Sequence, residues 1–211
     1  LMGAGFGAGP QHSQNLYAML TAIPGLKVAL PSSPADAKGL LATAIRDNDP
    51  VIFCEHKLLY GETGEVPDGE YLVPFGKANI TRSGTDVTLV AFSRMVLLAN
   101  KVADKLAREG ISVEVIDPRT TSPLDRDAIL ASVGKTGRLV VLDESDPYCG
   151  MASEITALAA TEAFSSLKAA PAKITPPHTP VPSTPHLEQL WLPSLERIEN
   201  TIRATVGKRA A

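Results

Sequence analysis

The sequence has few aromatic side chains and no long stretch of one character. Aromatic residues make up 5% of its 211 residues, so the core has to be built from aliphatic side chains. No apolar run approaches the ~20 residues that a membrane-spanning helix needs, and no run of Lys and Arg exceeds two residues. With a formal net charge of −3, the chain lacks the basic stripe of a nucleic-acid-binding protein. We therefore expect neither a membrane protein nor one whose main partner is nucleic acid.

Cysteine is also scarce. Cys54 and Cys149 stand far apart and match no zinc-binding spacing. They could form one disulfide, but a reduced pair is the better expectation, and it is typical of a cytoplasmic protein. The hydrophobic fraction of 44% and the charged fraction of 20% are ordinary for a folded protein. The length predicts one large domain or two small ones.

Strands and helices alternate along the sequence. Short runs of Val, Ile and Leu predict strands at residues 26–30, 51–54, 77–81, 87–92, 111–116, 138–142 and 172–175. Helical spacing of apolar residues predicts helices at 10–23, 34–46, 95–108, 124–133, 150–164 and 193–206. Residues 55–84 show little hydrophobic periodicity. An irregular segment of that length is usually a functional loop or a linker between domains. The alternation predicts an α/β fold with a mostly parallel sheet covered by helices on both faces.

Residues 3–9 form a glycine-rich run at the start of the chain, with no strand or signal sequence before it. Because a glycine-rich loop usually connects two secondary-structure elements, we expect the chain to begin inside a domain. A dinucleotide-binding loop needs a preceding strand and a helix start with free amides, and Pro10 stands at that start. A flexible loop that passes close to another backbone is the better interpretation.

His12 follows this run at a predicted helix start, between Gln11 and Ser13. Imidazole titrates near neutral pH and can move protons. The polar neighbourhood favours a functional site, although a lone histidine is more often a structural or surface residue.

Charged residues follow three predicted strands. Glu55 and His56 follow the strand at 51–54, Arg119 follows the strand at 111–116, and Asp143 and Glu144 follow the strand at 138–142. Ligand sites in open α/β sheets gather at such strand ends. The residues alone nevertheless favour plainer roles: a solvated loop pair for the first, a salt bridge to another subunit or loop for Arg119, and capping or surface positions for the last two.

The predicted helix at 34–46 ends in acidic residues. Asp47 and Asp49 follow the carbonyl groups of Ala44 and Ile45, and carbonyls at a helix end point outward with negative polarity. Such oxygens could hold a hard monovalent or divalent cation. A simple capped turn is the alternative that the residues alone favour.

Six stretches occur in an order that resembles a known family. They are residues 9–14 (GPQHSQ), 24–28 (PGLKV), 36–41 (DAKGLL), 44–47 (AIRD), 50–53 (PVIF) and 117–125 (DPRTTSPLD). Together they resemble the β subunit of the thiamine diphosphate-dependent component of 2-oxo acid and acetoin dehydrogenase complexes. Residues 177–182 and the pair at 143–144 are most similar to acetoin dehydrogenase β subunits, while pyruvate and branched-chain forms stay open.

The resemblance implies a domain order and a set of partners. A transketolase-like pyrimidine-binding domain would cover residues 1–75, a linker 76–85, and a transketolase C-terminal-type domain 86–211. The partners would be an α subunit in an α2β2 heterotetramer and a lipoyl acyltransferase core. The α subunit would hold Mg²⁺ and the diphosphate of the shared thiamine diphosphate. The usual subunit has a preceding part that carries the cofactor-activating glutamate, so we expect this chain to be inactive alone.

The resemblance also assigns roles to two of the candidate sites. His12 matches the family's active-site histidine, which faces the small-molecule substrate and the reaction intermediates. Ala44, Ile45, Asp47 and Asp49 match ligands of a structural potassium ion, and Asp49 stands where some members have asparagine.

The expected reaction is cleavage of a C–C bond in acetoin, or decarboxylation of a 2-oxo acid, with transfer of the acyl group to a lipoyl arm. The alternative is a non-catalytic assembly module that clamps the α subunit and docks the acyltransferase core.

Overall fold

The structure, a computed structural model, describes residues 1–207, so residues 208–211 of the predicted C-terminal domain lie outside the described residues. Its larger sheet has five strands in the order β3-β5-β4-β7-β8. They are β3 (Asn79–Arg82), β4 (Val87–Ala91), β5 (Val113–Asp117), β7 (Leu139–Leu142) and β8 (Ala172–Ile174). All neighbours are parallel except β3, which is antiparallel to β5 at the edge. The predicted mostly parallel sheet is confirmed.

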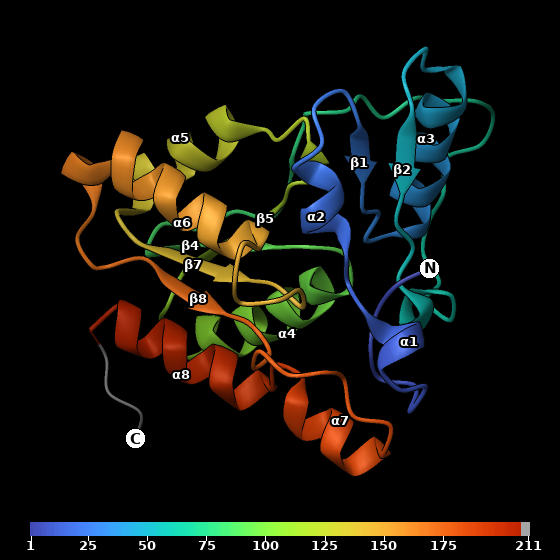
Figure 1. Cartoon of the computed structure of the whole chain (residues 1–211). Coiled ribbons are helices and arrows are strands. Elements are labelled where there is room, and N and C mark those ends of the chain that lie inside the picture. The colour runs from blue at the N-terminus through green and yellow to red at the C-terminus, as the bar shows by residue number, and fades with distance from the viewer. Residues whose placement is uncertain (208–211) are drawn as a thin grey trace.

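Two pairs of helices cover this sheet, as Figure 1 shows. They are α4 (Arg94–Ala107) and α8 (Leu195–Thr205) on one face, and α5 (Arg126–Thr136) and α6 (Met151–Glu162) on the other. Within residues 1–207, no helix is both long enough and apolar enough to cross a bilayer.

Strand β4 shows how the sequence sets the core. Val87, Leu89 and Ala91 point into the cluster under α4 and α8, whereas Val90 points into the cluster under α5 and α6. All four are fully buried. Because successive side chains of a strand point to opposite faces, a continuous apolar run is what a strand covered on both sides requires.

A smaller sheet of three strands lies beside the larger one, at the right of Figure 1. Its strands β1 (Lys27–Ala29) and β2 (Val51–Phe53) are parallel, and α3 (Pro34–Arg46) connects them. The third strand, β6 (Thr120–Ser122), comes from the later part of the chain and pairs antiparallel with β1. The sequence did not predict β6, because its three polar residues show no hydrophobic alternation.

Helix α3 begins where the sequence predicts. Ser33 is its N-cap, and the Ser33 hydroxyl accepts a hydrogen bond from the Asp36 N–H at 3.1 Å. Pro34 occupies the first turn, where its missing N–H costs nothing.

The single helix predicted at residues 10–23 is wrong. The structure has two short helices there, α1 (Pro10–Ser13) and α2 (Tyr17–Thr21), because Gln14 adopts extended backbone dihedrals. At the break, the Asn15 side-chain amide donates hydrogen bonds to the backbone carbonyl and a carboxylate oxygen of Glu144, both at 3.1 Å. A tertiary contact overrides the local helical pattern.

Three further elements are too short to show a periodic pattern. They are α7 (Pro185–Trp191) and the 3₁₀ turns η1 (Lys57–Leu59) and η2 (Phe164–Ser166).

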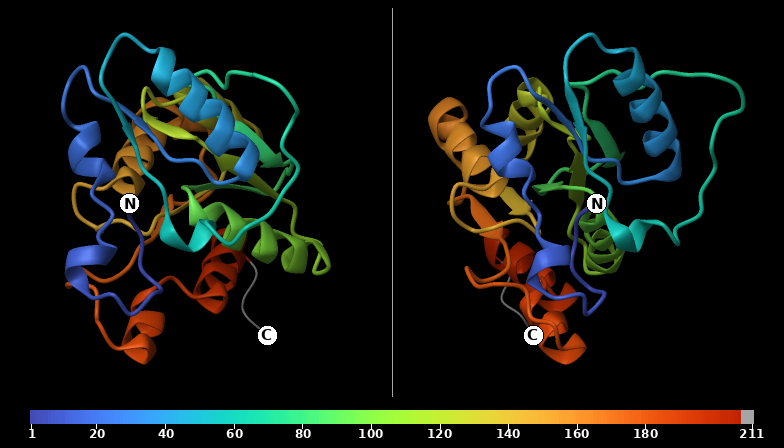
Figure 2. Two further views of the ribbon diagram at one scale, coloured as in Figure 1. Left: turned by 90° about the vertical axis from the view of Figure 1, so that its right-hand side faces the viewer. Right: turned by 45° about the vertical axis from the view of Figure 1, so that its right-hand side comes forward.

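The long segment between η1 and β3 runs along the outside of α3, as Figure 2 shows. Hydrogen bonds tie it to α3: the Tyr71 hydroxyl donates to the Ala35 carbonyl at 2.6 Å, and the Lys38 ammonium donates to the Pro67 carbonyl at 2.7 Å. Both cysteines are free thiols, as expected.

Candidate functional site

The glycine-rich run is a loop with left-handed backbone at every second residue. Gly3, Gly5, Gly7 and Gly9 have φ values of 97°, 108°, 66° and 73°. A side chain at Gly3 is excluded twice, because its Cβ would also lie 2.2 Å from Nε2 of His56. The expected close approach to another backbone is found at Gly7, whose Cβ would lie 3.3 Å from the Ser183 carbonyl oxygen, whereas the neighbour of Gly3 is an imidazole ring. The hydrogen bonds that hold the loop at Ala4 and Gly7 do not fit the expected flexibility.

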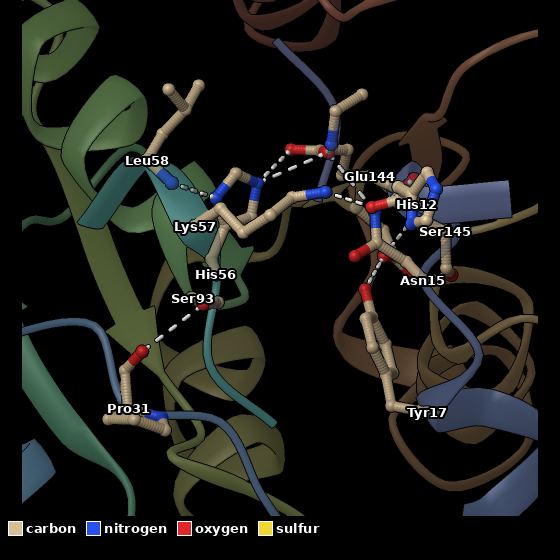
Figure 3. A network of polar contacts seen from close by, with 12 residues as sticks. His12, Asn15, Tyr17, Pro31, His56, Lys57, Leu58, Ser93, Glu144 and Ser145 are labelled. Atoms are coloured by element: carbon tan, nitrogen blue, oxygen red, sulfur yellow. Dashed lines mark hydrogen bonds and ion pairs between the residues drawn. The ribbon is translucent and has the colours of Figure 1, made fainter. Parts of the chain in front are cut away.

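His56 and Glu144 form a buried pair at the ends of β2 and β7 (Figure 3). Nε2 of His56 lies 3.0 Å and 3.2 Å from the two carboxylate oxygens of Glu144. The Leu58 N–H donates to Nδ1 of the same ring at 3.1 Å, which makes Nδ1 an acceptor. The ring proton therefore sits on Nε2 and is donated to Glu144.

This pair corrects two expectations. His56 is 2% exposed and Glu144 is 4% exposed, so neither is a solvated or surface residue. In the sequence, both residues closely follow predicted strands. Because the carboxyl ends of parallel strands can lie close together, this shared position could have indicated that the two side chains meet.

Glu144 and a second buried glutamate hold the glycine-rich loop. The Ala4 N–H donates to Oε1 of Glu144 at 2.8 Å, and the Gly7 N–H donates to Oε2 of Glu188 at 2.7 Å. Glu188 lies in α7, a helix that the sequence did not predict. No pattern in the sequence therefore indicated that Glu188 binds the loop.

His12 stands at the end of this loop, in α1, and is exposed. Its backbone carbonyl accepts a hydrogen bond from the Lys57 ammonium, and Lys57 follows His56 in the chain. Figure 3 shows the resulting network from His12 through Lys57 to His56 and Glu144. Next to His12, the buried hydroxyl of Ser13 has no hydrogen-bond partner in residues 1–207. The loop therefore presents an imidazole at the surface from a fixed backbone.

Asp143 is fully buried directly after β7, against α2 and the start of α6. Its carboxylate accepts hydrogen bonds from the Tyr17 hydroxyl, from Ser145 and from the Ala152 N–H near the start of α6. Burial raises the pKa of the Asp143 carboxyl, and burial raises the pKa of Tyr17 as well. The expected capping role fits the contact with Ala152, whereas a surface position does not.

Arg119 forms a salt bridge, but its partner lies in a helix of the same chain and not in another subunit or a loop: its guanidinium lies 2.7 Å from the carboxylate of Asp36 in α3. Neighbouring Asp117 is fully buried and accepts hydrogen bonds from the Ser32 hydroxyl and, at 2.8 Å, from the Arg119 N–H. Burial raises the pKa of Asp117 to about 7.

The raised pKa of Asp117 predicts a pH-dependent stability. The folded protein holds this proton up to about pH 7, while the unfolded chain loses it near pH 4, so folding stability falls as pH rises between those values. We expect the wild type to lose about 2–3 kcal/mol more than Asp117→Asn between about pH 5 and about pH 8. Urea unfolding of both proteins at several pH values measures the free energy of unfolding. An equal change of this free energy with pH in the wild type and in Asp117→Asn would contradict the prediction.

The four residues of the expected cation site lie together at the end of α3. The Lys27 ammonium, however, lies between the two acids, 2.7 Å and 2.8 Å from the carboxylate oxygens of Asp47 and 3.0 Å from Asp49. The contact with Asp47 raises the pKa of Lys27, and the contact with Lys27 lowers the pKa of Asp47. The Ala44 carbonyl accepts from the Asp47 N–H at 3.4 Å. The acidic turn is thus already neutralised in part by a lysine, and potassium binding stays a prediction.

A pocket of about 390 Å³ opens where the ends of β7 and the loop before α2 meet. Its lining includes Gln14, Asn15, Glu144, His178 and Trp191. His12 is not among its lining residues. The pocket and the exposed histidine are therefore separate features.

Comparisons with known proteins match both parts of the chain. The family model for the C-terminal domain of transketolase matches residues 76–198, and the model for the pyrimidine-binding domain of transketolase matches residues 2–63. A solved structure described as a split gene transketolase, inactive β4 tetramer, superposes with a TM-score of 0.81 at 22% identity, over 99% of this chain and 66% of that chain. That likeness supports the fold.

Curated relatives are more similar in sequence. The β subunit of acetoin:2,6-dichlorophenolindophenol oxidoreductase is 56% identical in Cupriavidus necator and 50% identical in Bacillus subtilis, over 98% and 99% of this chain. The mitochondrial pyruvate dehydrogenase E1 component subunit beta-1 of Arabidopsis thaliana is 50% identical over 99% of this chain. The chain spans 61%, 61% and 57% of these three relatives.

These matches confirm the resemblance to acetoin and pyruvate dehydrogenase β subunits and the predicted fold class. The order of the two matched models also agrees with the small sheet preceding the large one. The chain therefore belongs to the transketolase family, with sequence of the pyrimidine-binding domain followed by that of the C-terminal domain.

Proposed function

We propose that the chain is part of the β subunit of a thiamine diphosphate-dependent dehydrogenase that acts on acetoin, with pyruvate or another 2-oxo acid as the alternative substrate. The observation that carries the proposal is 56% identity to an acetoin oxidoreductase β subunit, together with His12 on a loop fixed by buried carboxylates. We further propose an α subunit and a lipoyl acyltransferase core as partners and a cytoplasmic location.

The residues around His12 fit a shared cofactor site. His12 is exposed, and the orphaned hydroxyl of buried Ser13 beside it offers a further polar group. When bound, thiamine diphosphate supplies the electron sink for breaking the C–C bond. We assign its diphosphate and Mg²⁺ to the α subunit, as the resemblance to acetoin and pyruvate dehydrogenase β subunits implies.

In this proposal His12 moves or holds a proton at the substrate oxygen. An imidazole can donate a hydrogen bond to an oxygen on which negative charge develops and can return the proton later. The loop keeps the imidazole facing out from the subunit, where a partner subunit would close the site and exclude water. The chain alone would then present half a site.

An assay with several substrates tests this proposal. The intact subunit, assembled with its α subunit, should reduce 2,6-dichlorophenolindophenol with a higher kcat/KM for acetoin than for pyruvate or branched-chain 2-oxo acids. A preference for a 2-oxo acid would reassign the substrate. No turnover with any of them would contradict the proposed activity.

Exposed apolar side chains support the alternative of a non-catalytic assembly module. Leu16, Met19 and Ile23 around α2 are 47–60% exposed, and Leu187 and Leu190 on α7 are 51% and 71% exposed. Where such side chains form a contiguous patch, the patch is typical of a protein interface. The two functions separate in the His12→Ala variant, because assembly without turnover supports catalysis, and full turnover supports the module alone.

We also propose that potassium binds at the turn formed by Ala44, Ile45, Asp47 and Asp49. Their carbonyl and carboxylate oxygens are the donors that hard cations take, and Lys27 shows that a positive charge is accommodated there. Potassium would bind either beside this ammonium or in its place.

We predict that potassium raises the melting temperature of the intact assembly by about 3 °C over tetramethylammonium at equal ionic strength. In Lys27→Met the two acids lose their ammonium, so the potassium effect should be larger. Thermal unfolding in the two chloride salts measures both effects. Superimposable melting curves in both salts, for both proteins, would show that no cation binds.

A further inference from the structure

The glycine-rich loop at residues 3–9 has no regular structure, yet its backbone is held at two points. The Ala4 N–H donates to Glu144 at 2.8 Å, and the Gly7 N–H donates to Glu188 at 2.7 Å. Both acceptors belong to the C-terminal part of the chain, 140 and 181 residues away. The conformation of the loop therefore depends on the other domain.

Both carboxylates are deeply buried, which needs a reason. Glu144 is 4% exposed and Glu188 is 1% exposed. Burying a carboxylate is costly unless donors surround it. Glu144 receives donors from Ala4, Asn15 and His56. Glu188 receives the Gly7 N–H, while its other oxygen has no partner within residues 1–207. Contact with the loop is thus the compensation that the structure shows for burying Glu188.

The loop leads directly to His12. Gly9 is the N-cap of α1 and passes close to Ser183, since a Cβ at Gly9 would lie 3.1 Å from the Ser183 hydroxyl. From the other side, the Lys57 ammonium holds the His12 carbonyl. An error in the path of the loop would therefore move the imidazole.

We propose that Glu144 and Glu188 are positioning residues that fix the glycine-rich loop and, through it, the place of His12 in the active site. This inference rests on the proposed function, in which His12 contacts the substrate. It adds that the C-terminal domain sets the geometry of a site whose histidine lies in the pyrimidine-binding domain.

Two variants at one position separate the hydrogen bond from the bulk of the side chain. Glu188→Ala removes the acceptor of Gly7. Glu188→Gln keeps a carbonyl oxygen at that place, and the amide nitrogen takes the position of the oxygen that has no partner. Glu154→Gln on the exposed side of α6 is the matched control for the loss of a charge.

Glu144 is tested by one conservative variant. Glu144→Gln places an amide NH2 against a set of donors that includes the Nε2 proton of His56, so even this conservative change should disturb the loop. Its effect should therefore be larger than that of Glu188→Gln.

Hydrogen exchange in the intact assembly gives a readout that needs no turnover. In Glu188→Ala, exchange in the peptide covering residues 2–9 should rise about tenfold, while exchange of β4 should stay unchanged, because only a local opening is involved. Glu188→Gln should stay within about threefold of the wild type. In the activity assay, Glu188→Ala should lower kcat about 10–100-fold with little change in KM, since the imidazole is misplaced after binding. Glu188→Gln should restore most of kcat.

The outcomes are separable. Unchanged exchange at residues 2–9 in Glu188→Ala overturns the inference, whatever the activity. Faster exchange in Glu188→Ala with an unchanged kcat also overturns the inference. In that case, loss of activity in His12→Ala would still support the proposed function. An inactive wild-type assembly contradicts the proposed function, and exchange still decides whether the two carboxylates hold the loop.

Discussion

Replacing His12 by alanine in the assembled enzyme should lower turnover by ~10²–10⁴-fold, the usual contribution of a positioned proton-transfer group. The melting temperature should move by less than about 2 °C, because the side chain is exposed and its backbone carbonyl, which binds Lys57, is kept. The measurement is steady-state kinetics beside thermal unfolding.

His186→Ala is the matched control, since His186 is an exposed histidine in another short helix, α7. It should keep full activity. If His12→Ala lost stability in proportion to activity, or if His186→Ala lost activity to the same degree, His12 would be a structural residue.

Gly3→Ala should be the most damaging single substitution in the glycine-rich loop. The new Cβ would lie 2.2 Å from Nε2 of His56, in a ring that is held on both sides by Leu58 and Glu144. The backbone at φ 97° adds strain for any residue with a side chain. Overpacking and strain together should lower the free energy of unfolding by roughly 3 kcal/mol. Activity should fall with it, because the loop carries His12.

Gly25→Ala separates the cost of backbone strain from the cost of overpacking against His56. Gly25 also has a left-handed backbone, with φ 89°, but no atom lies within 4 Å of a Cβ built there. Its cost should be about 1–2 kcal/mol, the strain alone. Denaturant unfolding of both variants measures the difference. Equal losses of the free energy of unfolding in the two variants would show that the His56 ring moves aside and that overpacking adds no cost at Gly3.

Much of the fold could be predicted because local and global signals agree. At α3, the cap Ser33, the first-turn Pro34 and the apolar spacing all indicate the same start. The apolar run of β4 identifies a strand buried on both faces. The failures lie where tertiary contacts decide: Asn15 breaks the predicted helix by binding Glu144, and β6 forms because β1 offers an unpaired edge.

The candidate site could be predicted only in pieces. The strand-end rule singled out the positions of His56 and Glu144, yet composition could not show that these two side chains meet, since 88 residues separate them. Glu188 had no signal, because its helix lies in a proline-rich segment and its partner is a backbone N–H. Lys27 likewise shows its role only when β1 brings it beside the end of α3. The limits at 75 and 85 of the predicted domains stay predictions.

In the proposed function, this chain contributes His12 to a thiamine diphosphate-dependent site shared with an α subunit. The most direct measurement is the rate of acetoin-dependent dye reduction by the cofactor-free assembly, before and after thiamine diphosphate and Mg²⁺ are added. We expect a saturable rise from baseline in the wild type and a rise reduced ~10²-fold or more in His12→Ala. A rate that does not depend on the cofactor, or a full rise in His12→Ala, would contradict it.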